Sequence, residues 1–138
     1  MPSHRSCSLC RLGVDRREIA AIFAGGFAGA VLRALIEDRI PHDPDTWPWA
    51  TFAINIAGAI LLGWLVTRLQ ERLPLSAYRR PLLGTGFCGA LTTFSTMQVE
   101  LLDMLDAGNT GLALGYAVAS IVVGFAAVAL VTNVVRAR

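Results

Sequence analysis

Apolar residues along this chain gather into four long runs that are separated by short polar segments. Each run approaches the ~20 residues that an α-helix needs to cross the hydrocarbon core of a bilayer. None shows the alternation of apolar and polar residues that is typical of membrane β-barrel strands. We therefore predict an all-α membrane protein with four transmembrane helices, at about residues 19–36, 50–69, 81–105 and 112–135.

Composition supports a membrane protein and leaves no room for a water-soluble catalytic domain. The 138 residues are 54% hydrophobic and 16% charged, with a mean hydropathy of +0.55. A soluble domain carries about 25% charged residues. Because four spans use nearly the whole chain, we expect a transporter or channel in contact with lipid, and no enzyme. No basic stripe with interleaved aromatic residues is present, so we expect no nucleic-acid partner.

The arginines are distributed unequally between the two sides of the predicted membrane domain. With four spans, the N-terminal segment, the loop between the second and third spans and the C-terminus share one side. That side holds ten of the twelve basic residues, whereas the opposite side holds Arg39 alone. Because basic loop residues stay in the cytoplasm, this asymmetry predicts one fixed orientation in the cell (plasma) membrane, with both termini cytoplasmic.

Residues 1–18 are predicted to form a cytoplasmic extension, followed by a membrane domain over residues 19–138. Cys7 and Cys10 form an isolated C-x-x-C pair, and His4 is the one further metal-ligating side chain nearby. A structural zinc site needs four ligands, so this group is one ligand short. We interpret the two cysteines as incidental thiols.

The third span differs from a helix that simply faces lipid. Its segment 84–96 contains three glycines and five hydroxyl residues. Glycine lowers helix stability by about 1 kcal/mol relative to alanine, and Ser and Thr side chains compete for backbone hydrogen bonds. We predict a third helix that is broken mid-membrane, with freed carbonyl groups suited to a cation and half-helix N-termini suited to an anion. The alternative is a continuous helix that packs its hydroxyl groups on a neighbour.

Other polar groups are predicted to face the same place. Asn55 lies in the middle of the second span, where an amide is costly unless it has a partner. Tyr116 and Ser120 share one face of the fourth helix, because they are four residues apart. Phe94 and Met97 share a face of the third, and the partly positive edge of a phenylalanine ring attracts anions. These side chains are therefore candidates for an anion path.

Two charged residues lie close to this polar region. Arg33 is the one basic residue inside a span, where it either draws anions into a vestibule or extends to the interface. Glu100 lies one turn beyond the hydroxyl cluster. The centres of the first and second spans carry no carboxylate, which a proton-coupled antiporter of this size would need.

Pairs of small residues four positions apart predict close approach between helices. The pairs are Gly25 and Gly29, Ala59 and Gly63, and Gly111 and Gly115. Four short helices do not easily enclose a pore, so we expect an oligomer whose subunits pack through these pairs. The alternative is that the pairs pack helices within one subunit.

Three segments of the chain have distinctive motifs, namely Gly25-Gly26-Phe27-Ala28-Gly29-Ala30-Val31-Leu32-Arg33, Asn55-x-x-Gly58 and Gly86-Phe87-Cys88-Gly89-Ala90-Leu91-Thr92-Thr93-Phe94-Ser95-Thr96. These motifs resemble those of the Fluc (CrcB-type) fluoride channel family. They occur in the family's order and spacing over nearly the whole chain after residue 18. The third-span motif is highly specific, whereas the glycine-rich motif alone would be weak.

The resemblance implies a fluoride-specific channel that passively exports fluoride from the cytoplasm and so lowers its toxicity. It also implies an antiparallel dimer with two pores and a central structural sodium ion, held by backbone carbonyls of Gly89 and Thr92. Together with the hydroxyl cluster, the predicted fluoride pore comprises Asn55, Phe94, Met97, Thr93, Ser95, Tyr116 and Ser120. The predicted vestibule residues are Arg33 and Glu100.

Two features depart from the family pattern. Met97 stands where many members have a second phenylalanine, and a thioether lacks the positive ring edge. The arginine bias does not fit a homodimer, whose subunit must insert in both orientations. We therefore hypothesise that this chain is the N-in subunit of a heterodimer with an oppositely oriented homologue, and keep the homodimer as the alternative.

The sequence is compatible with two alternative functions. A small multidrug-type proton antiporter has a similar length and four spans, although it carries a membrane carboxylate that is missing here. A non-transporting subunit that only stabilises a partner's pores is the other, because the arginine bias indicates a partner. Passive fluoride export remains the main prediction, since fluoride enters cells as neutral HF, dissociates, and is expelled as the anion by the membrane potential.

Overall fold

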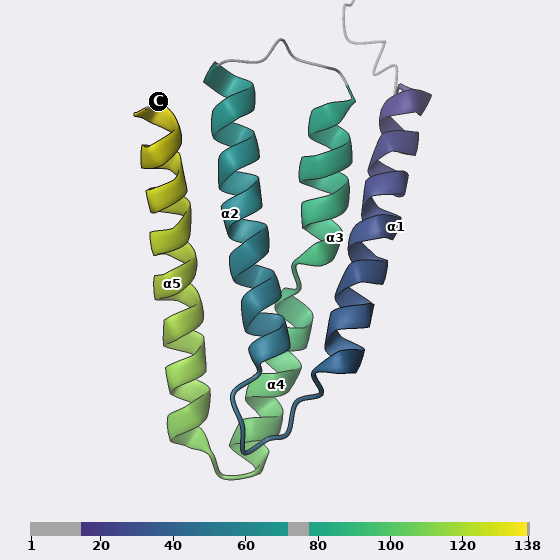
Figure 1. Cartoon of the computed structure of the whole chain (residues 1–138). Helices are drawn as coiled ribbons and strands as arrows, with labels where there is room; N and C mark the ends of the chain where they lie inside the picture. The colour runs from purple at the N-terminus through teal and green to yellow at the C-terminus, as the bar shows by residue number, and fades with distance from the viewer. Residues whose placement is uncertain (1–14, 72–77, 138) are drawn as a thin grey trace, which may run out of the picture.

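A computed structural model of the chain describes residues 15–71 and 78–137, which form helices and contain no strand. The three long helices are α1 (Arg16–Arg39), α2 (Trp49–Glu71) and α5 (Thr110–Arg136). Three shorter helical elements follow one another between α2 and α5, namely η1 (Pro81–Cys88), α3 (Gly89–Leu91) and α4 (Phe94–Asp106). Figure 1 shows an upright bundle in which α1 begins, η1 begins and α5 ends at the same end. The all-α prediction is confirmed for the described residues.

The first helix begins inside the predicted N-terminal extension. The Asp15 side chain accepts a hydrogen bond from the Arg17 amide at 2.9 Å, which satisfies one of the unpaired N–H groups at the helix start. This cap starts α1 at Arg16, three residues before the predicted span. Cys7, Cys10 and the rest of residues 1–14 lie outside the described residues.

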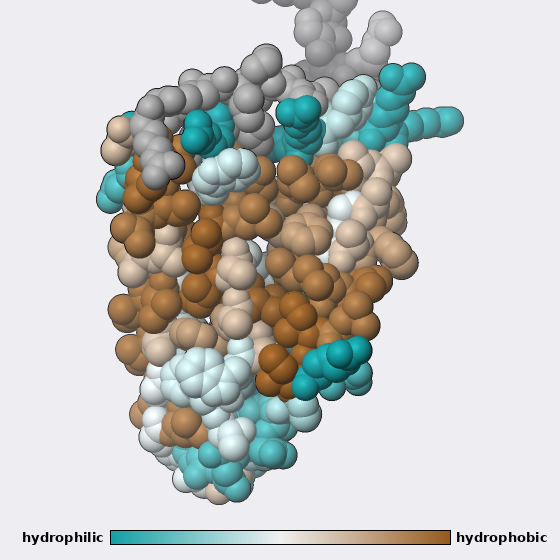
Figure 2. Space-filling model, viewed as in Figure 1, coloured by the Kyte–Doolittle hydropathy of each residue, from teal (hydrophilic) through white to brown (hydrophobic). Residues whose placement is uncertain are grey.

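Three helices are long and apolar enough to cross a membrane, namely α1, the Trp49–Arg68 part of α2, and α5. Their apolar side chains largely face outward, since only 11% of the most apolar window of α1 and 6% of that of α5 is buried. Figure 2 shows an apolar band across the middle of one face, with polar residues toward both ends. An apolar exterior of this extent is typical of a surface covered by lipid or protein. The chain is therefore a multi-pass membrane protein.

Glycines allow α1 to pack directly on the backbone of η1. A Cβ atom built on Gly25 would collide with the carbonyl oxygen of Leu82. A Cβ atom on Gly86 would lie 2.5 Å from the carbonyl oxygen of Ile22. Gly29 is equally constrained by the Phe87 carbonyl. Only residues without a side chain permit this approach between two helices of the same chain.

The small-residue pairs accordingly act within the chain in two of three cases. Gly25 and Gly29 contact η1, and a Cβ atom on Gly63 would lie 2.9 Å from a methyl group of Val131 on α5. The alternative of packing within one subunit is therefore confirmed for Gly25, Gly29 and Gly63, and packing between subunits stays a prediction. A Cβ atom on Gly111 or Gly115 would meet nothing within 4 Å.

A tight turn sets α4 and α5 against each other at the far end of the bundle. Gly108 has φ +84°, and the Asn109 amide donates to the Met104 carbonyl at 2.8 Å. The Asn109 side chain also donates to the Pro44 carbonyl at 3.1 Å and so holds the α1–α2 loop to this turn. Met104 and Tyr116 are fully buried here and form the core of this end.

Candidate functional site

Two threonines with extended backbone separate α3 from α4. Thr92 has φ −74° and ψ 147°, and Thr93 has φ −141° and ψ 118°. Thr93 then caps α4, because its Oγ1 accepts a hydrogen bond from the Thr96 amide at 3.1 Å and donates to Thr96 Oγ1 at 2.9 Å. Residues 84–91 stay helical, so the non-helical backbone is confined to two residues.

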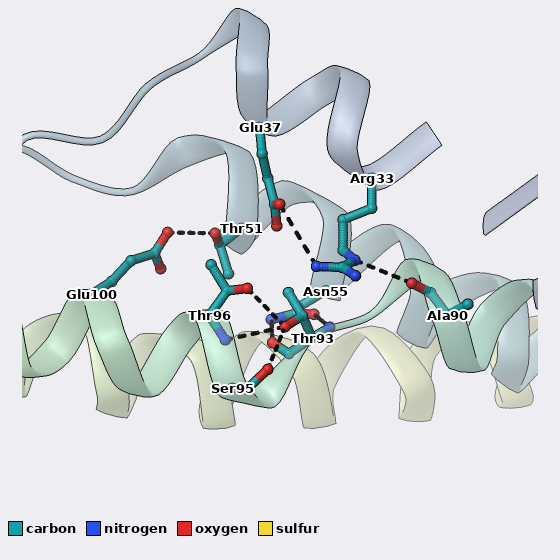
Figure 3. A network of polar contacts seen from close by, with 9 residues as sticks. All are labelled: Arg33, Glu37, Thr51, Asn55, Ala90, Thr93, Ser95, Thr96 and Glu100. Atoms are coloured by element: carbon teal, nitrogen blue, oxygen red, sulfur yellow. Dashed lines mark hydrogen bonds and ion pairs between the residues drawn. The ribbon is translucent and has the colours of Figure 1, made fainter. Parts of the chain in front are cut away.

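Asn55 on α2 binds this extended backbone through both ends of its amide. Its Nδ2 donates to the Thr93 carbonyl at 3.0 Å, and its Oδ1 accepts from the Thr93 amide at 2.9 Å. The side chain thus satisfies the two backbone groups that the end of the helix leaves unpaired. Figure 3 shows the pair at the centre of the polar network. Asn55 is therefore the residue that fixes the conformation of the α3–α4 connection.

The glycine three residues after Asn55 has a steric role in the same place. A Cβ atom built on Gly58 would collide with the Cγ2 methyl group of Thr92. Thr92 in turn donates its hydroxyl to the Cys88 carbonyl at 3.0 Å. The Asn55-x-x-Gly58 motif therefore combines a side chain that binds the connection with a space that receives Thr92.

The carbonyl of Gly89 loses its usual partner at the end of α3. In a continuous helix the Thr93 amide would bond this carbonyl, but here that amide donates to Asn55. Gly89 also borders two cavities, of about 530 Å³ and about 380 Å³. Carbonyls at an interrupted membrane helix are ligands that suit Na⁺. The described residues contain no cluster of three or more His, Cys, Asp or Glu side chains that could hold a metal ion.

The smaller of these cavities, here called the Asn55 cavity, is lined by three of the seven predicted pore residues. Asn55, Thr92, Thr93 and Phe94 line it together with glycine and apolar residues of α2 and η1. The Phe94 ring is 72% exposed at the first position of α4. The Asn55 amide has two N–H groups and uses one of them on Thr93, so the other remains to donate.

Arg33 on α1 reaches the same region from the opposite side of α3. Its Nε donates to the Ala90 carbonyl at 3.2 Å, and its guanidinium lies 3.6 Å from the Glu37 carboxylate. Figure 3 shows these contacts above the Asn55–Thr93 pair. Arg33 is half-buried and pairs with both groups, so its side chain lies against the bundle.

Glu100 lies in a closed hydrogen-bonded group between three helices. Its carboxylate accepts hydrogen bonds from the Thr51 hydroxyl on α2 and from the Tyr116 hydroxyl on α5, the latter at 2.9 Å. Glu100 is 6% exposed and Tyr116 is fully buried. The rings of Trp47 and Tyr116 meet edge to face, with centroids 5.5 Å apart. This Glu100 group is a packed region beside the Asn55 cavity and shares no lining residue with it.

The remaining predicted pore residues are divided between these two regions. Ser95 is exposed, with its hydroxyl 3.3 Å from Thr93 Oγ1, next to the Asn55 cavity. Met97 packs against the buried Tyr116 and Met104 side chains. The hydroxyl of Ser120 is buried and has no hydrogen-bond partner among the described residues.

Thr51, which donates to Glu100, is not among the residues predicted from the sequence. A signal for it was present, because Thr51 lies one helical turn before Asn55 on the same face of α2. The aromatic residues Trp47 and Phe52, whose rings lie against Tyr116, were not predicted either. Their contact with Tyr116 depends on how α2 and α5 pack.

The amino-acid sequence matches a known family over most of its length. Residues 20–132 match the model of "CrcB-like protein, Camphor Resistance (CrcB)". This chain belongs to the CrcB-like family. The match runs from α1 to α5 and includes every residue of the Asn55 cavity and of the Glu100 group. The family prediction from the three motifs is therefore confirmed.

Several named relatives of this CrcB-like chain are similar along nearly their whole length. "Fluoride-specific ion channel FluC 1" of Mycolicibacterium paratuberculosis is 59% identical over 122 residues, which cover 88% of this chain and 92% of the relative. "Fluoride-specific ion channel FluC" of Bacteroides fragilis is 40% identical over 81% of this chain and 91% of the relative. The protein of that name from Methanopyrus kandleri is 39% identical over 83% and 86%, respectively.

Proposed function

We propose that this CrcB-like chain is a subunit of a membrane channel that lets fluoride leave the cytoplasm. The observation that carries the proposal is the Asn55 cavity, where an amide, two threonines and an exposed phenylalanine ring meet at an interruption between helices. The names of its relatives support fluoride as the ion. The interruption lies about midway along the third spanning segment, because η1 and α3 precede it and α4 follows it.

The lining of the Asn55 cavity suits an anion that must lose its hydration shell and must then be released. The second N–H of the Asn55 amide, the threonine hydroxyl groups and the edge of the Phe94 ring are weak donors that replace hydration one contact at a time. No charged side chain of the described residues lines this cavity. An ion is therefore neither repelled by a carboxylate nor held by a cation, which permits conduction.

We propose further that two subunits associate in opposite orientations. Phe23 and Phe27 of α1 are exposed and border the 530 Å³ cavity, so a second subunit would cover a large apolar surface there. Gly89, whose carbonyl lacks its usual helical partner, lines the same cavity. In the dimer, carbonyls of Gly89 and Thr92 would hold a sodium ion, which supplies a fixed charge that joins the subunits at the interrupted helices.

The partner in this proposal is an oppositely oriented homologue rather than a second copy. The ends of the bundle differ strongly in charge, because Arg16, Arg80 and Arg136 all lie at the end where α1 and η1 begin and α5 ends. This end would face the cytoplasm in every molecule, so the termini would be cytoplasmic and one orientation would dominate. A reporter fused to the C-terminus would be detected only in the cytoplasm. Detection of the reporter on both sides of the membrane would favour the homodimer.

The two predicted vestibule residues have different roles in this proposal. Arg33 lies beside the α3–α4 connection and adds positive potential near it while its charge is balanced by Glu37. Glu100 is enclosed by Thr51 and Tyr116 and positions the α4 and α5 helices. Met97 and Ser120 lie next to the Glu100 group. They would contact fluoride only if the ion path runs along α5.

Growth of a fluoride-sensitive bacterium tests the proposed function. Cells that lack their own fluoride exporters would receive this chain together with an oppositely oriented CrcB-like homologue, each also expressed alone. We expect the pair to restore growth in fluoride, with no protection against cationic dyes. Protection against dyes without protection against fluoride would indicate a proton antiporter instead and would contradict the proposal.

A further inference from the structure

A second cavity adjoins the Asn55 cavity on the side where η1 begins. It has a volume of about 300 Å³ and lies between α2 and η1. Leu62 and Gly84 line both cavities, so the two adjoin at these residues. A Cβ atom built on Gly84 would lie 3.9 Å from Leu62 Cδ1, so the absence of a side chain at Gly84 keeps this junction wide. The second cavity is here called the Arg80 cavity, after its one charged residue.

Arg80 is exposed and lines this cavity together with Thr85 and three apolar residues of α2. Among the described residues, it is the only charged side chain that borders either cavity. No hydrogen bond or ion pair joins it to another residue that the structure describes. Its guanidinium is a cation with five N–H donors. The Arg80 cavity therefore carries a positive charge that no side chain of the described residues pairs with.

We propose that Arg80 attracts fluoride to the cytoplasmic mouth of the path and so sets the rate at which ions enter the Asn55 cavity. The inference rests on the proposed function and adds an entry site to it. A charge at the mouth of a cavity with low-dielectric walls raises the local concentration of the opposite ion. Leu65 and Val66 supply such walls on α2. Because Arg80 is exposed, water screens its charge and the ion is released onward rather than held.

Arg79 provides a matched control for this role. It is the preceding residue, it is equally exposed, and it contributes the same charge to the orientation of the protein in the membrane. It lines neither cavity. An effect of net charge or of membrane orientation would thus be shared by the two arginines, whereas an effect on ion entry would be confined to Arg80.

Fluoride efflux from phosphatidylcholine liposomes tests the inference. Wild-type protein, Arg80→Gln, Arg80→Lys and Arg79→Gln would be compared in the dimer that conducts, at ionic strengths of about 0.01 M and about 1 M. We expect Arg80→Gln to lower the initial rate at low ionic strength about threefold or more, because steering by surface charge changes rates by factors of about 10 to 1,000. The loss should vanish at high ionic strength, where the Debye length falls to about 3 Å. Arg80→Lys and Arg79→Gln should conduct like the wild type.

Other results overturn the inference. Equal rates for Arg80→Gln and wild type at low ionic strength, or an equal loss in Arg79→Gln, would show that Arg80 does not act on ion entry. A loss that persists at high ionic strength would indicate a structural defect, and a loss seen only in liposomes with anionic lipid would indicate a lipid headgroup at Arg80. Absence of fluoride efflux through the wild type would contradict the proposed function itself, together with this inference.

Discussion

Asn55 holds the backbone of Thr93 by two hydrogen bonds, one from its Nδ2 to the carbonyl at 3.0 Å and one to its Oδ1 from the amide at 2.9 Å. A side chain from α2 thereby replaces the helical bonds that the α3–α4 connection lacks. The same contact removes the amide partner of Gly89 and sets the position of Phe94, the first residue of α4. One amide therefore links the conformation of the connection to the shape of the cavity.

Replacing Asn55 by aspartate is expected to abolish fluoride flux. The carboxylate cannot donate to the Thr93 carbonyl, and its charge repels an anion in the cavity. Two like charges 4 Å apart cost about 4 kcal/mol at an effective dielectric constant of 20. We therefore expect the efflux rate from liposomes to fall at least about 100-fold. Asn133→Asp on the exposed surface of α5 is the control and should conduct normally. Normal flux through Asn55→Asp would remove this residue from the path.

The exposed ring of Phe94 is expected to raise the rate of fluoride efflux, whereas a similarly exposed ring elsewhere on the protein is not. Phe94 on α4 is 72% exposed and Phe125 on α5 is 77% exposed, but only Phe94 borders the Asn55 cavity. Phe94→Leu removes the positive ring edge while keeping an apolar side chain. Its efflux rate should fall about tenfold, as a loss of about 1.4 kcal/mol predicts. If Phe125→Leu slowed efflux as much, the ring would have a general role in folding or assembly.

The Glu100 group is expected to contribute to stability. Thr51→Val and Tyr116→Phe each remove one donor from the buried carboxylate, at a cost of about 1–3 kcal/mol. Thermal unfolding in detergent, followed by tryptophan fluorescence, should show a lower Tm for both variants. Their combined effect should differ from the sum, because they share one acceptor. Tyr78→Phe, at a half-exposed position outside this group, is the control, and a Tyr116→Phe variant as stable as this control would argue against the group.

Addition of a methyl group at Gly25 is expected to disrupt the contact between α1 and η1. The new Cβ would collide with the Leu82 carbonyl, and backbone cannot move aside as a flexible side chain can. Overpacking of this kind costs about 1–3 kcal/mol, so Gly25→Ala should lower the Tm or the yield of folded protein. Gly111→Ala, where a Cβ meets nothing within 4 Å, should fold like the wild type. Equal stability of the two variants would show that α1 and η1 pack less closely.

The helices could be predicted from the apolar runs, but their interruption could be predicted only approximately. The glycines and hydroxyl residues of segment 84–96 predicted an unwound segment between two half-helices. Gly86 in fact serves the close approach of α1, and extended backbone is confined to Thr92 and Thr93. The local sequence does not distinguish a glycine required for helix packing from a glycine that ends a helix. The distinction depends on the helix that packs against it, which is distant in the sequence.

The candidate site was predicted by residue type but not by arrangement. Asn55, Thr93 and Phe94 meet as the motifs indicated, because all lie close to the connection between α3 and α4. Glu100 was predicted as a vestibule residue one turn beyond the hydroxyl cluster, and the structure buries it. Its carboxylate is buried against hydroxyl donors on α2 and α5. The way in which these helices pack against α4 cannot be predicted from the residues next to Glu100 in the sequence.

Fluoride efflux from liposomes, measured with a fluoride electrode, tests the central claim most directly. Three preparations would be compared. They contain this chain alone, this chain together with an oppositely oriented CrcB-like homologue, and that homologue alone. The account predicts rapid efflux of fluoride, and none of chloride, when both chains are present, and no efflux from this chain by itself. Efflux from this chain alone would keep the channel and contradict the heterodimer. No fluoride efflux from any preparation of folded protein would contradict the proposed function.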